Sequence, residues 1–96
     1  MSNMKPKLYI IHSEYVSNGI IFNPRTKYTT DPEKATRIYE ETLAAMKEDN
    51  ADILKDKENY RSSTYNRGHK RYFTCFYKYQ PGVSNFTVDM SVDHLE

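Results

Sequence analysis

The chain has one cysteine, no tryptophan and three glycines among its 96 residues. The low numbers of cysteine and glycine exclude particular structural features. With Cys75 as its one cysteine it cannot form an intrachain disulfide, so we expect a protein of a reducing compartment. No apolar run is long enough for a membrane span or for the apolar region of a signal peptide. We therefore expect a cytoplasmic protein that does not contact a membrane.

Residues arranged for catalysis or metal binding are also lacking. The glycines lie in turn contexts, so the chain has no glycine-rich loop that could hold a phosphate group. The histidines, His12, His69 and His94, are far apart and lack the spacing of a zinc site. Cys75 could be a nucleophile, but a cysteine in the middle of a strand is typically a small buried apolar residue. We predict a protein that is not an enzyme and has no metal or other cofactor.

The overall composition suits one soluble domain over residues 1–96, with residues 1–6 and 94–96 loose. The chain is 38% hydrophobic and 28% charged, and its formal net charge is +1. Residues 31–58 hold nine Asp or Glu against five Lys or Arg, whereas residues 59–88 hold five Lys or Arg and no acid. A nearly neutral chain therefore contains an acidic segment and a basic segment.

The N-terminal part predicts a hairpin. Residues 8–16 are rich in β-branched and aromatic side chains, which is typical of a strand. Residues 17–19, Ser-Asn-Gly, favour a turn. A second strand is expected from Ile20, and Asn23-Pro24 should bend or break it.

The clearest signal is an amphipathic helix that starts near Asp31. Either Asp31 caps this helix with Pro32 at its first position, or Thr30 and Glu33 form a capping box. Apolar side chains then recur at spacings of three and four along one stripe: Ala35, Ile38, Tyr39, Leu43 and Met46. The helix either continues to about Glu58 or breaks near Asn50 and restarts.

The C-terminal part alternates with a period of two, which is typical of strands. Residues 60–65 predict a short strand and residues 66–69 a turn, and residues 71–80 predict a strand with aromatic rings on both faces. Residues 83–95 predict a strand with one apolar face. The inward side chains of that face are Phe86, Val88, Met90 and Val92.

The fold class that follows is α+β: an antiparallel sheet of four to five strands with one long amphipathic helix packed on one face. We predict that the helix stabilises this arrangement by burying Ile38, Leu43 and Met46 against the last strand. The expected contacts on that strand are Phe86, Val88 and Met90.

The candidate binding surface lies in residues 60–79, which hold seven aromatic residues and five Lys or Arg. Alternation assigns Phe73, Cys75 and Tyr77 to the core. The opposite side and the adjoining turn then form a basic patch with aromatic contact. Its candidate binding residues are Arg67, His69, Lys70, Arg71, Tyr72 and Lys78. An alternative interpretation needs no partner. The aromatic rings would be half-buried in the sheet, and the cations would be exposed to water.

The layout of roughly residues 7–45 resembles small accessory proteins of phages and mobile elements. The resemblance rests on the strand LYIIHSEYV, the hairpin after it, the helix entry TDPEKA and the tyrosine-rich strands. Such proteins are often host-directed inhibitors, for example anti-CRISPR proteins, and they act by binding. The resemblance implies the host cytoplasm as the location and matches no individual functional residues.

We therefore expect a non-enzymatic binding protein that blocks a larger host or defence protein, or a ribonucleoprotein, through the basic aromatic surface. The alternative is a nucleic-acid-binding regulator, because rings can stack on bases while cations neutralise phosphates. A third interpretation is an accessory subunit that forms a homodimer through an edge strand or the acidic helix. The acidic helix should keep nucleic acid from wrapping round the sheet, and this favours a protein partner.

Overall fold

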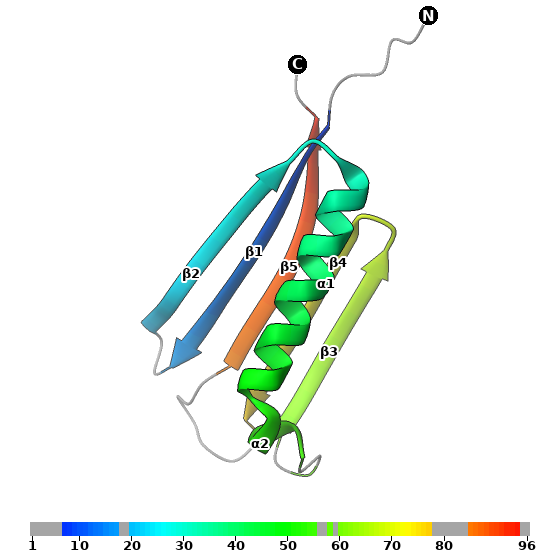
Figure 1. Cartoon of the computed structure of the whole chain (residues 1–96). Helices are drawn as coiled ribbons and strands as arrows, with labels where there is room; N and C mark the ends of the chain where they lie inside the picture. Colours follow the sequence, from blue (N-terminus) through cyan, green and yellow to red (C-terminus); the bar gives the residue numbers. More distant parts are fainter. Residues whose placement is uncertain (1–6, 18–19, 56–57, 59, 78–84, 95–96) are drawn as a thin grey trace, which may run out of the picture.

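The computed structural model describes residues 7–17, 20–55, 58, 60–77 and 85–94 (Figure 1). Its elements, in chain order, are β1 (Lys7–Ser17), β2 (Ile20–Thr29), α1 (Pro32–Asp49), α2 (Ala51–Leu54), β3 (Tyr60–Arg67), β4 (Lys70–Tyr77) and β5 (Asn85–His94). The five strands form one antiparallel sheet in the order β2-β1-β5-β4-β3. Helix α1 lies along one face of this sheet and leaves the other face uncovered by any described element (Figure 1). The predicted α+β fold is confirmed.

Asp31 fixes the start of α1. Its side chain accepts hydrogen bonds from the backbone N–H groups of Glu33 at 3.0 Å and Lys34 at 3.4 Å. Pro32 occupies the first turn, where a missing N–H leaves no partner unsatisfied. Of the two caps that the sequence allowed, the one with Asp31 is therefore present.

The long helix ends at Asn50. The Asn50 side chain donates to the Met46 carbonyl at 2.7 Å and to the Tyr15 hydroxyl oxygen at 3.2 Å. Regular α1 ends at this point, and the helix that the described residues form beyond it is the short α2. Of the two alternatives, the break near Asn50 with a restart is the one present. Helix α2 ends at Leu54, short of Glu58, and residues 56, 57 and 59 lie outside the described residues.

The core lies between α1 and the three inner strands. Its buried side chains are Tyr9, Ile11, Ala35, Tyr39, Met46, Phe73, Cys75, Phe86, Val88 and Met90. The apolar face predicted for the last strand is confirmed, as are Phe73 and Cys75. The side chain of Tyr77 lies outside the described residues.

The helix is rotated slightly from the predicted orientation. Ala35 and Tyr39 are buried with Met46, whereas Ile38 and Leu43 pack against the core while only partly buried. Ala35 is fully buried, and its small side chain lets the first turns of α1 approach the sheet closely. The prediction was therefore right for Met46 and overstated the burial of Ile38 and Leu43.

Local irregularities shape the two hairpins. In β2, Asn23 has a φ of +49° and the register with β1 shifts between Ser13 and Tyr15, so Asn23-Pro24 bends the strand without ending it. The β3–β4 loop is only Gly68-His69, with a φ of +63° at Gly68, as a type II′ turn requires. Because the loop is so short, β3 continues through residues 66–67, which the sequence had assigned to the turn.

Candidate functional site: the open face of the sheet

The sheet face away from α1 carries a row of side chains that crosses all five strands. Antiparallel pairing places Thr26 opposite His12, His12 opposite Asp89, Asp89 opposite Tyr72, and Tyr72 opposite Tyr65. Directly opposite residues in an antiparallel sheet point to the same face and can contact one another. We call this uncovered surface the open face.

An aromatic pair occupies one end of the row. The rings of Tyr65 on β3 and Tyr72 on β4 are stacked, with centroids 5.5 Å apart and planes 6° from parallel. Each of these residues is 38% exposed, a large aromatic surface in contact with water. Stacked aromatic pairs are rigid and present a flat apolar face with polar tips, which suits a contact surface.

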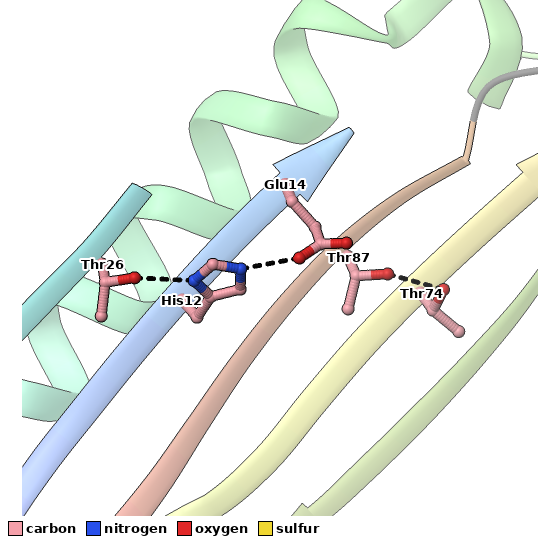
Figure 2. Close-up of polar contacts among 5 residues, drawn as sticks. All are labelled: His12, Glu14, Thr26, Thr74 and Thr87. Carbon is pink, nitrogen blue, oxygen red and sulfur yellow. Dashed lines mark hydrogen bonds and ion pairs between the residues drawn. The ribbon is translucent and has the colours of Figure 1, made fainter. Parts of the chain in front are cut away.

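The middle of the row is polar and half-buried. His12 bonds through Nδ1 to the Thr26 hydroxyl at 2.8 Å and through Nε2 to Glu14 Oε1 at 2.7 Å (Figure 2). The Nε2 atom donates its proton to the carboxylate, since a carboxylate only accepts. Two strands therefore hold the imidazole in one orientation.

Asp89 lies beside this pair, and the pKa of its carboxyl is raised. Burial is the main cause, because it disfavours the charged form. His12 opposes the shift by lowering the pKa, and the charge of Glu14 adds to it by raising the pKa. A proton is therefore held more tightly at the centre of the open face than on a free aspartate.

A second polar link joins β4 and β5 on the same face. The hydroxyls of Thr74 and Thr87 lie 3.1 Å apart, within hydrogen-bonding distance, and both side chains are half-buried (Figure 2). Glu14 is opposite Thr87 in the register, so this pair adjoins the group formed by His12, Glu14, Thr26 and Asp89, which we call the His12 cluster. These contacts satisfy the polar groups of the open face and lend it order.

The structure divides the predicted binding residues between the two faces. Arg67 and Lys70 are directly opposite each other beside the Gly68-His69 turn, on the same face as Tyr72, and all three are exposed. Lys78 lies outside the described residues. The predicted patch therefore keeps Arg67, Lys70 and Tyr72 as a contiguous group, and we call these residues with Tyr65 the tyrosine patch.

Arg71 and His69 belong to the helix side. Arg71 alternates away from Lys70 and Tyr72, and its Nε donates to the Gly68 carbonyl at 2.6 Å. The His69 ring meets the Tyr9 ring edge-on, with centroids 5.0 Å apart. These two side chains fasten the turn to the core side of the sheet, so they do not share a surface with the tyrosine patch.

Arg71 also lies near enough to Tyr39 to affect the phenol. Burial raises the pKa of Tyr39, the charge of Arg71 lowers it, and the charge of Asp89 raises it. Burial likewise raises the pKa of the Cys75 thiol, which keeps the thiol protonated and poorly nucleophilic.

Sequence reasoning missed Tyr65 and the His12 cluster as parts of this surface. His12 and Glu14 are two apart in a strand, a spacing that places them on one face. That signal was available, but Asp89 lies at the other end of the chain and only the β1–β5 register brings it to them. Tyr65 joins Tyr72 for the same reason, through the β3–β4 register.

A groove of about 430 Å³ lies on the helix side, between α1 and β2. Its walls carry opposite charges, with Arg25 and Lys27 on the strand and Glu41 and Asp49 on the helix. Ser13, only 7% exposed, forms part of its floor. The basic residues of β2 are thus directed away from the open face, where the cations among the described residues lie on β3 and β4.

Comparison with protein-family models, with curated proteins and with solved structures finds no match to this chain. Among the residues that the structure describes, no group of three or more His, Cys, Asp and Glu side chains is arranged to hold a metal ion. None of the described helices is long and apolar enough to cross a membrane.

Proposed function

We propose that this chain is a non-catalytic binding protein that contacts a larger protein through the tyrosine patch. The observation that carries the proposal is the stacked, exposed pair Tyr65 and Tyr72 beside Arg67 and Lys70, on a sheet face that no described element covers. Tyr and Arg are, with Trp, the residues enriched at the energetic centres of protein interfaces. A rigid pair of rings also loses little conformational entropy on binding.

The distribution of charge on the open face favours protein over nucleic acid as the partner. Glu14 and Asp89 lie in the middle of this face, and Asp89 is directly opposite Tyr72. A single strand stacked on the tyrosines would run its phosphates close to these carboxyl groups, which repel them. Proteins that bind single strands line the path of the backbone with cations. A protein surface can instead match a basic region and an acidic region side by side.

The class of partner follows from the resemblance to small accessory proteins of phages and mobile elements. We propose that the partner is a host or defence protein, or a ribonucleoprotein, and that binding inhibits it. Occupying a surface of the larger protein would be enough, because inhibition by blocking requires no chemistry from the tyrosine patch.

The test is affinity capture from the native host with and without nuclease, using the parent and a charge variant. Arg67→Glu with Lys70→Glu reverses the charge of the tyrosine patch without touching the core. Lys34→Glu with Arg37→Glu is the matched control, because these exposed residues lie on α1. Circular dichroism verifies that all three proteins are folded.

We expect the parent and the helix control to capture a protein that survives nuclease, and the patch variant to lose it. Loss of every partner after nuclease treatment would favour the nucleic-acid alternative. In that case the affinity should also fall with salt, at a log–log slope of about −0.7 to −0.9 per phosphate contact. Unchanged capture by the patch variant would contradict both functions.

A further inference from the structure

The two edges of the sheet differ in how well they are protected against pairing with another strand. Edge strand β2 carries Pro24, the bulge at Asn23 and the cations Arg25 and Lys27. Proline, bulges and charges are the devices by which natural edges avoid pairing. At the other edge, β3 also carries two cations, Arg61 and Arg67, but it has neither a proline nor a bulge. Residues 60–67 pair with β4 in unbroken register.

The register shows which backbone groups of β3 point outward. In a hairpin closed by a two-residue loop, the flanking pair, here Arg67 and Lys70, exchanges both backbone hydrogen bonds. Hydrogen-bonded pairs alternate along a ladder, so Tyr65, Ser63 and Arg61 also face β4. The N–H and C=O groups of the alternate residues then point away from the sheet. These residues are Tyr60, Ser62, Thr64 and Asn66.

We propose that β3 is a dimer interface at which a second copy of this chain pairs antiparallel, about a two-fold axis perpendicular to the sheet at Ser63. The two sheets would join into one, with their open faces on the same side. In this register Ser62 lies opposite Thr64 of the second copy, and both present outward backbone groups. Tyr60 likewise lies opposite Asn66, so every outward pair can form hydrogen bonds.

Electrostatics favours this register over the one with the axis at Thr64. With the axis at Ser63, Arg61 lies opposite Tyr65 of the second copy, an arrangement that allows a cation–π contact. With the axis at Thr64, Arg61 would lie opposite Arg67, and directly opposed like charges destabilise a sheet. At the chosen axis the two copies of Arg61 are four residues apart along the strands, roughly 13 Å. That separation exceeds the Debye length of about 8 Å at physiological ionic strength. Arg67 and Arg61 of the second copy then lie on a diagonal, two residues apart along the strands, instead of directly opposite each other.

Pairing at β3 would also bring the two tyrosine patches together. Across the joint, a row would run from Tyr72 and Tyr65 of one copy to Arg61 of the second copy. The two-fold axis would generate the same row in the opposite direction, starting from the second copy. The dimer stands on the edge geometry alone and does not depend on the proposed function. A chain that dimerises but captures no partner would support the dimer and not the proposed function. A monomeric chain that captures the partner would support the proposed function and not the dimer.

The first test is sedimentation over a range of concentrations with Thr64→Pro. Proline removes the outward N–H of Thr64 and leaves the β3–β4 ladder complete, so the variant should be folded and monomeric. Ser63→Pro is the matched control, since its N–H faces β4 and its loss should lower the melting temperature. A parent chain that stays monomeric up to roughly 1 mM, the weak end of specific association, would overturn the proposal. A folded Thr64→Pro variant that still dimerises would do the same.

Cross-linking tests the register independently of proline. Ser63→Cys places two thiols across the axis, and Cys75 is buried and should not compete. We expect this variant to form a disulfide-linked dimer under mild oxidation much faster than Ser91→Cys, an exposed position on the same face of central strand β5. Equal rates for the two variants would overturn the proposal, and faster cross-linking of Thr64→Cys would overturn the axis at Ser63.

Discussion

The two faces of the sheet are built from alternating residues of the same strands, yet they have opposite properties. On the helix side of β5, Phe86, Val88 and Met90 are at most 2% exposed and pack beneath α1. On the open face of the same strand, Thr87 and Asp89 are half-buried and bonded or coupled to polar neighbours. Apolar burial on one face thus supplies the stability that leaves the other face free for contact.

The largest expected effect comes from truncating a ring on the covered face. Phe86→Ala should lower the free energy of unfolding by about 3–5 kcal/mol, because it removes a buried ring next to Phe73 and leaves a cavity. Tyr72→Ala, the matched change on the open face, should cost only about 0.5–1.5 kcal/mol through lost stacking. Urea unfolding of both variants measures the contrast. Equal losses of unfolding free energy in the two variants would mean that the two faces contribute equally to stability.

The rotation of α1 predicts unequal losses along its stripe. Met46→Ala should cost about 2–5 kcal/mol, because the side chain is buried, and Leu43→Ala should cost less, because Leu43 is only partly buried. The original expectation placed both in the core. Thermal melting of the two variants side by side measures the difference, and a larger loss at Leu43 would contradict the observed orientation of the helix.

A smaller effect is expected at the start of the helix. Asp31→Ala removes the acceptor of the Glu33 and Lys34 N–H groups and should cost about 0.5–2 kcal/mol. Thr30→Ala is the control, since the capping box that would have used Thr30 is not formed. Melting temperatures that fall equally in the two variants would argue against the Asp31 cap.

The smallest effect is a dependence on pH at the centre of the open face. The folded pKa of Asp89 is raised above its ordinary value of 3.8, so its protonated form favours the fold. That contribution is complete below the unfolded pKa and is lost as the pH rises through the folded pKa. Asp89→Asn, which stays neutral, should therefore gain melting temperature over the parent at about pH 7 more than at about pH 3. The opposite order would mean that His12 outweighs burial.

Much of the fold could be predicted because local patterns determine it. The Asp31-Pro32 helix start, the stripe ending at Met46 and the alternation of residues 86–92 each appear within a short window of sequence. The break at Asn50 was harder to predict, because one of the bonds made there is to Tyr15, thirty-five positions away. Short-range periodicity does not contain such contacts.

The candidate site was predicted only in part. Alternation correctly placed Tyr72 and Phe73 on different faces of the sheet. It should also have placed Arg71 and Lys70 on different faces, but the turn predicted over residues 66–69 obscured this. The two-residue loop extends both strands and therefore fixes which cations share a face. The pairing of Tyr65 with Tyr72, and of His12 with Asp89, depends on register between strands, which a single sequence does not determine.

The account rests most directly on the claim that the open face binds and the covered face stabilises. The decisive measurement is partner capture from nuclease-treated native lysate by a Tyr65→Ala and Tyr72→Ala double variant, compared with the parent at a temperature where both are folded. We predict that the double variant loses the partner while keeping the parent's circular dichroism spectrum. Capture at the parent's level by the folded double variant would contradict the claim.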